Sequence, residues 1–192
     1  MRGSHYGEDA MSTGVNGNRT YRWLAGLLGA LTLLAATLAP SAAAETTIGN
    51  VGDTLRVNYK GLVADVTVHN VLPSDEPPGW TWNGTPRWRN QGGPWKSDVT
   101  VHVISTPNPY WMASGATFTG VTPFADAYVS KHTDDPNALE LKLLSAPAGS
   151  TVDGVVYWDV YRGLVSNVVM LNPATGTHLA QWNLWQPGTP IP

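Results

Sequence analysis

The 192-residue chain contains no cysteine. This absence excludes disulfide bonds, thiol catalysis and metal sites built from thiolates. Charged residues are also scarce, at 13% of the chain, and the formal net charge is −3. A chain without a basic surface lacks the electrostatic character of a nucleic-acid-binding protein, so we expect no nucleic-acid partner.

Several catalytic motifs are absent as well. The sequence has no Gly-x-Ser-x-Gly element and no pair of histidines at metalloprotease spacing. No glycine-rich loop stands between a predicted strand and a predicted helix, so nucleotide binding is not indicated. We therefore predict a protein that is not an enzyme and that uses no metal or other cofactor.

A long apolar run lies near the start of the chain. It covers Ala25–Pro40, two arginines precede it, and the small residues Ser41–Ala44 follow. This order is typical of a secretory signal peptide. A retained transmembrane helix is the alternative, but about 16 residues are short for a bilayer span of about 20. We predict that residues 1–44 are a signal peptide cleaved after Ala44, which leaves a secreted protein without a membrane anchor.

Residues 45–192 have the pattern of one domain built from short strands. Apolar and polar side chains alternate with a period of two, and turns rich in Gly, Pro, Asn and Asp separate the runs. No stretch of ten or more residues shows helical periodicity. The pattern predicts an all-β fold, an antiparallel sandwich of two sheets, with a small barrel as the alternative. The predicted strands are 49–61, 62–72, 96–105, 116–121, 125–132 and 139–144.

The segment 152–187 is the most apolar part of this domain. Val156, Trp158 and Val160 share one face of its first run, and two turn-rich breaks divide it into three runs. We predict a three-strand antiparallel meander that a second sheet covers. Asp159 is an acid inside a strongly apolar run, and we expect it to have a structural role.

The connection 76–95 is rich in tryptophan and reads EPPGWTWNGTPRWRNQGGPW. It holds four of the nine tryptophans, and its prolines and glycines oppose a regular strand or helix. One interpretation is a lid whose indoles cover one end of the sandwich, and the other is a binding surface. Trp95 adjoins a predicted strand and is expected in the core. The candidate ligand-binding residues are Trp80, Trp82, Trp88, Arg87 and Arg89.

Two histidines fall on the predicted solvent faces of their strands. If those strands are neighbours, His69 and His102 could meet and form a metal site or a pH-sensitive pair. Solvated or locally hydrogen-bonded imidazoles are the simpler interpretation. His132 precedes Asp134 and Asp135 in a predicted turn, where these residue types commonly stabilise the turn itself.

Several segments occur in a familiar order: TIGNVGDTL and GLVADVTVHNV near residue 50, Trp95 followed by VTVHV, then YWDV, VVM and LWQP. Over residues 46–187 the chain resembles the secreted mycobacterial immunogenic protein family named MPT sixty-three. The resemblance implies an immunoglobulin-like antiparallel sandwich, secretion, and no established enzymatic activity. The tryptophan-rich connection is longer than its counterpart in that family, so no binding role is inherited there.

These features together predict a secreted, non-enzymatic binding module for a cell-envelope or host component. Its ligand would be a glycan, a lipid or a host protein, and the protein itself would be a monomer or a weak dimer. The alternative is a secreted carbohydrate-active hydrolase that uses a carboxylate pair beside the tryptophan-rich loop.

Overall fold

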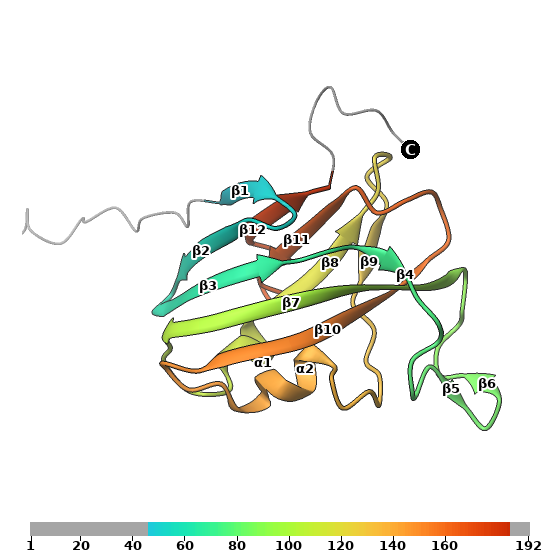
Figure 1. Cartoon of the computed structure of the whole chain (residues 1–192), viewed down its shortest axis with the longest axis horizontal. Coiled ribbons are helices and arrows are strands. Elements are labelled where there is room, and N and C mark those ends of the chain that lie inside the picture. The colour runs from blue at the N-terminus through green and yellow to red at the C-terminus, as the bar shows by residue number, and fades with distance from the viewer. Residues whose placement is uncertain (1–45, 185–192) are drawn as a thin grey trace, which may run out of the picture. The chain divides into compact units, whose positions relative to one another are not determined.

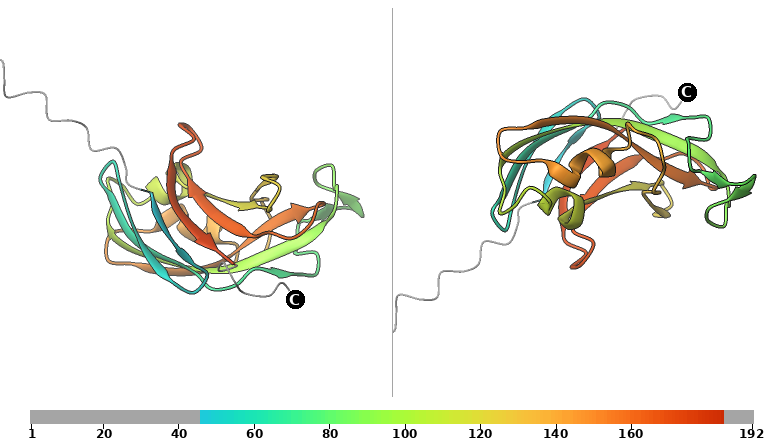
Figure 2. Two further views of the ribbon diagram at one scale, coloured as in Figure 1. Left: turned by 90° about the horizontal axis from the view of Figure 1, so that it is seen from above. Right: turned by 90° about the horizontal axis from the view of Figure 1, so that it is seen from below.

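The computed structural model describes residues 46–184. The predicted signal peptide and its cleavage point lie outside these residues. Strands far outnumber helices in the described chain, and Figure 2 shows two sheets stacked as two layers. The all-β sandwich predicted from the alternating pattern is therefore confirmed, because the strands form two separate sheets and not a closed barrel.

The first sheet has five strands in the order β1-β12-β11-β8-β9. All neighbours are antiparallel except β1 and β12, which run parallel. The prediction of a wholly antiparallel fold is wrong at this edge. Its strands are β1 (Thr47–Asn50), β8 (Thr117–Val121), β9 (Ala127–Val129), β11 (Asn167–Leu171) and β12 (His178–Asn183).

The second sheet has the order β10-β7-β3-β2, and the short β4 also pairs with β7. Beyond β4 and the adjoining ends of β7 and β10 lies a separate hairpin, β5–β6 (Figure 1). The strands are β2 (Thr54–Tyr59), β3 (Leu62–Val68), β4 (Leu72–Pro73), β5 (Thr81–Trp82), β6 (Thr85–Pro86), β7 (Gly93–Ser105) and β10 (Thr151–Val160).

The core lies between the sheets, where the predicted inward faces meet. In β7 the side chains of Val99, Val101 and Val103 are buried, and β2 and β3 alternate in the same way. Trp158 of β10 is fully buried, and its Nε1 donates a hydrogen bond to the Phe118 carbonyl of β8 at 3.0 Å. This contact satisfies a buried polar group and joins the two layers.

The predicted C-terminal meander is wrong in its pairing. β11 and β12 form a hairpin in the first sheet, but β10 pairs with β7 in the second. Residues 161–166 cross from one sheet to the other, and Val165 is fully buried on the way. All three runs are apolar because both sheets contribute to one core, so apolar character alone did not reveal which strands are partners.

The predicted strand at 139–144 is also wrong. Residues there form helix α2 (Leu139–Lys142) and the 3-10 turn η1 (Leu143–Ser145), after an earlier short helix α1 (Trp111–Gly115). Leu139 and Leu143 are buried four residues apart, whereas Leu141 and Leu144 are exposed, which is helical spacing. No helix within residues 46–184 is long and apolar enough to cross a membrane.

Candidate functional site

The tryptophan-rich connection contains a small β-hairpin. The prediction that its prolines and glycines would prevent a regular strand is wrong for β5 and β6, which are two residues each. Asn83 and Gly84 form the turn, with φ of 50° and 82°. Positive φ at both central positions is what a tight hairpin turn requires, and Asn-Gly is the preferred pair. Trp82 and Thr85 therefore face each other across the tip of the hairpin.

The base of the hairpin rests on two indoles in edge-to-face contact. Trp80 is fully buried, and its ring meets Trp88 edge to face, with centroids 4.6 Å apart and planes at 75°. The Lys131 ammonium lies 5.4 Å from the centroid of the half-buried Trp88 ring. Burial removes Trp80 from the residues that can touch a ligand at the surface. Trp80 is thus packed inside the connection, as the lid interpretation expects, but neither Trp80 nor Trp88 belongs to the hydrophobic core between the sheets.

Polar contacts tie the hairpin base to the segment before α2. The Arg87 guanidinium contacts the Asp134 carboxylate at 2.7 Å. The Asp134 amide donates to the Pro78 carbonyl at 2.7 Å, and the Arg87 amide donates to the Trp80 carbonyl at 2.9 Å. Arg87 is thus engaged within the fold, which leaves less of its guanidinium for a ligand than the sequence analysis assumed.

Three of the five predicted residues are exposed, and of these Arg87 is the one that Asp134 engages. Trp82 is 66% exposed at the hairpin tip, and Arg89 is exposed after β6. The exposed indole is accessible to a partner. The base of the connection is therefore packed into the protein, and its tip is the candidate binding surface.

Asp159 holds the other end of the connection. Its two carboxylate oxygens accept the backbone N–H groups of Gln91 and Gly92, each at 2.9 Å, and the side chain is buried. The predicted structural role of Asp159 is confirmed. The carboxylate fixes the chain as it enters β7, opposite the end of β10.

The acidic residues near the hairpin are the candidates for the carboxylate pair of the predicted alternative, a hydrolase. Asp75 and Glu76 line a groove beside Lys96 and Tyr157, and no tryptophan lines it. The Tyr157 hydroxyl donates to the Asp135 carboxylate at 2.6 Å. Burial, and after it this hydrogen bond to a carboxylate, raises the pKa of the Tyr157 hydroxyl above its ordinary value. Asp135 is therefore held as a hydrogen-bond acceptor.

The two histidines on the outer face of the second sheet do not meet. His69 Nε2 contacts Thr100 Oγ1 at 2.8 Å, and that hydroxyl donates to Asp153 at 2.6 Å. His102 Nδ1 contacts Thr151 at 2.9 Å. In the part of the chain that the structure describes, no group of three or more His, Asp or Glu side chains could hold a metal ion.

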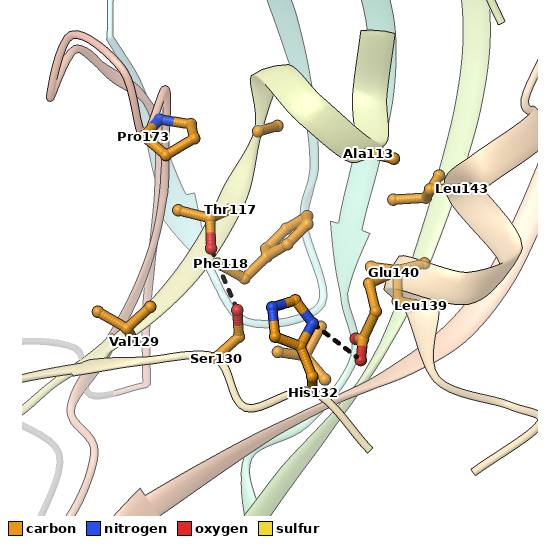
Figure 3. Close-up of a pocket in the computed structure, with 12 residues that line it drawn as sticks. Ala113, Thr117, Phe118, Val129, Ser130, His132, Leu139, Glu140, Leu143 and Pro173 are labelled. Atoms are coloured by element: carbon orange, nitrogen blue, oxygen red, sulfur yellow. Dashed lines mark hydrogen bonds and ion pairs between the residues drawn. The ribbon is translucent and has the colours of Figure 1, made fainter. Parts of the chain in front are cut away.

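A second site was missed by the sequence analysis. A cavity of about 290 Å³ opens at the side of the sandwich between α1, α2 and the edge strands (Figure 3). His132 and Glu140, assigned to a turn and to a strand, lie at its rim. No local motif indicates this cavity, because residues from five separate segments of the chain line it.

Comparison with solved structures finds proteins to which parts of this chain are similar. The secreted protein MPT63 from Mycobacterium tuberculosis superposes with a TM-score of 0.56 at 19% identity, covering 73% of this chain and 98% of that one. An uncharacterized β-sandwich protein from Clostridium difficile superposes with a TM-score of 0.37 at 9% identity, covering 73% of this chain and 97% of that one.

No protein-family model matches the chain, and a comparison with curated proteins finds no match either. At 19% identity, the likeness to MPT63 establishes a shared β-sandwich fold. The resemblance seen in the sequence is thus confirmed for the fold.

Proposed function

We propose that the protein is a secreted, non-enzymatic β-sandwich that binds a carbohydrate of the cell envelope or of a host surface through the β5–β6 hairpin. The exposure of Trp82 carries this proposal. An indole face offers a flat apolar platform on which the C–H face of a sugar ring can stack. The exposed Arg89 adds N–H donors suited to hydroxyl or carboxylate groups of the same ligand.

The anchored base of the hairpin makes this platform suitable for recognition. The Trp80–Trp88 contact and the Arg87–Asp134 pair fix the two ends of the hairpin. The Asn83–Gly84 turn fixes its tip. A side chain held on a rigid support loses less conformational entropy when it binds, which favours affinity.

The same contacts support a binding role over hydrolysis. A glycosidase needs two available carboxyl groups that flank the bond it cleaves. Asp159 is occupied by two backbone N–H groups, Asp134 by Arg87, and Asp135 by Tyr157. Asp75 and Glu76 lie in a groove that no tryptophan lines. We therefore propose recognition without bond cleavage.

Two observations support secretion and a relation to the MPT sixty-three family. The sequence predicts a signal peptide over residues 1–44, and the shared fold is that of a protein described as secreted. We include in the proposal an immunoglobulin-like sandwich and membership of that family. Expression with residues 1–44 in an actinobacterial host should yield protein in the medium with Glu45 as its first residue, measured by N-terminal sequencing.

Binding is tested on a glycan array with the purified protein and three variants. Trp82→Ala should weaken binding at least about tenfold, since truncated aromatic anchors typically cost 2 kcal/mol or more. Arg89→Ala should weaken it less. Phe124→Ala is the matched control, because Phe124 is an even more exposed aromatic residue, at 80% against 66% for Trp82, outside the hairpin.

Three results would contradict the proposal. Equal binding by the wild type and by Trp82→Ala would remove the hairpin from the site. Binding only to lipid vesicles or to a host protein would show that the ligand is not a carbohydrate. Release of reducing sugar from a bound polysaccharide, abolished in an Asp75→Asn and Glu76→Gln double variant, would establish the hydrolase instead.

A further inference from the structure

The cavity at the side of the sandwich has an apolar floor that belongs to the core. Phe118, Leu139, Leu143 and Val156 line it, and each of them is at most 4% exposed. The cavity therefore reaches the interior and is not a shallow surface groove. Its size lies at the small end of ligand pockets.

The rim of the cavity carries a few polar groups. Thr117 and Ser130 share a hydrogen bond of 3.1 Å on one side. On the other side, His132 Nδ1 and Glu140 Oε1 lie 3.7 Å apart and point toward each other (Figure 3). An apolar body with a few placed polar groups at its mouth is the usual composition of a small-molecule site.

Glu140 is held in position by the backbone. Its Oε1 also accepts the Thr133 amide at 3.2 Å. Within residues 46–184 both of these contacts use Oε1, so Oε2 keeps its hydrogen-bonding capacity for a ligand. The side chain is 27% exposed, so its charge is partly shielded from water at the cavity mouth.

The charge at the rim favours a cation over an anion. The two lysines nearest in sequence are engaged elsewhere, Lys131 over the Trp88 ring and Lys142 at the Asp153 carbonyl. A protonated His132 would at most neutralise Glu140. While Glu140 is ionised the His132–Glu140 pair is therefore negative or neutral, and a carboxylate ligand would meet repulsion or no attraction there.

From this geometry we propose that the cavity binds a small amphipathic amine. Its apolar body occupies the space over Phe118, Leu139 and Val156, and its protonated amino group pairs with Glu140. None of the hairpin residues 80–89 lines the cavity, so this site is independent of the proposed carbohydrate site.

The test uses three probes with one skeleton: phenylbutylamine, phenylbutanol and phenylbutyrate. Binding to the purified protein is measured by calorimetry and mapped by amide chemical shifts. The amine should bind with a Kd of about 1 mM or tighter, as expected for a ligand of this size. It should bind about fivefold more tightly than the alcohol, as for a partly exposed ion pair, and the acid should bind most weakly.

Two variants locate the site, each with a matched control. Glu140→Gln should bring the amine to the affinity of the alcohol, whereas Glu76→Gln, the same change in another groove, should not. Ala113→Leu extends a side chain from α1 that lines the cavity and should weaken both ligands at least about tenfold. Ala127→Leu adds the same bulk at an exposed position on β9 and should leave binding unchanged.

The proposal is overturned if the alcohol binds as tightly as the amine, or if the acid binds best. It is also overturned if the ligand-induced shift changes avoid α2 and β8. If Ala113→Leu does not fold, the comparison of Glu140→Gln with Glu76→Gln still decides the outcome.

Discussion

The indole ring of Trp80 meets that of Trp88 edge to face at 4.6 Å, and this pair forms the base of the β5–β6 hairpin. The arrangement separates the tryptophans of one connection into two roles. Trp80 and Trp88 pack against each other, whereas Trp82, two residues beyond Trp80, points into solvent. The position of the turn explains the division: Trp80 lies before β5, whereas Trp82 is the last residue before the Asn83–Gly84 turn and stands at the tip.

Truncation of Trp80 and of Trp82 should therefore affect stability to very different extents. Trp80→Ala should lower the free energy of unfolding by about 3–5 kcal/mol, the usual cost of deleting a buried large aromatic side chain. Trp82→Ala should change it by less than about 0.5 kcal/mol, because the side chain is exposed. Urea unfolding followed by circular dichroism measures both. Equal destabilisation by the two variants would show that Trp82 also packs against the fold.

The ion pair between Arg87 and Asp134 should contribute little to global stability. Both side chains are partly exposed, at 32% and 60%. A double-mutant cycle with Arg87→Gln and Asp134→Asn should give a coupling free energy of about 0.2–1 kcal/mol, which decreases in high salt because exposed charges are screened. A coupling that persists unchanged in 1 M salt would indicate that the pair is shielded from solvent.

The sequence predicted the layers of this fold better than its connections. Alternation in β2, β3 and β7 reflects one buried face per strand, which is a local property that the sequence carries directly. The crossing at 161–166 and the cavity depend on which strands become neighbours, and no local period encodes that choice. The sequence did not predict helix α2, because a single helical turn contains too few residues to show a helical period.

The roles of the candidate binding residues could not be predicted from local sequence patterns either. Composition drew attention to 76–95, but it could not separate Trp80 from Trp82, because both are tryptophans flanked by turn-forming residues. Their separation depends on the Trp88 ring and on Asp134, which lies 47 positions beyond Arg87 in the chain. Long-range contacts of this kind become visible only in the folded structure.

The raised pKa of the Tyr157 hydroxyl predicts a loss of stability in alkali. Burial first, and then the hydrogen bond to Asp135, keeps the phenol protonated in the folded state. The unfolded chain releases this proton near the ordinary tyrosine pKa of about 10. The contribution is therefore fully present below about pH 10, and it is lost as the pH rises further, because only the unfolded state deprotonates.

Tyr157→Phe checks this dependence. The variant should be less stable at neutral pH, by about 1–3 kcal/mol, since it loses a hydrogen bond to a charged group. Its stability should then fall less steeply than that of the wild type above about pH 10. Tyr161→Phe is the control, because its ring is 49% exposed. Identical alkaline slopes for the wild type and Tyr157→Phe would contradict the prediction.

The approach of Gly92 to the Val160 backbone gives the most specific structural prediction. A Cβ added at Gly92 would stand 2.0 Å from the Val160 carbonyl oxygen, and backbone atoms there cannot move aside easily. The Gly92 amide is also held by the buried Asp159 carboxylate. Gly92→Ala should therefore displace the start of β7 from the end of β10 and destabilise the protein by about 2–4 kcal/mol.

Gly93→Ala is the matched control for Gly92→Ala. A Cβ at Gly93 meets no heavy atom within 4 Å, so the same substitution one residue later should change stability by less than about 1 kcal/mol. Asp159→Asn should cost about 1–3 kcal/mol, because its amide group faces a backbone donor that the carboxylate had satisfied. Thermal and urea unfolding of the three variants measure these differences. If Gly92→Ala and Gly93→Ala are equally stable, the close approach of the connection to Val160 does not exist in solution.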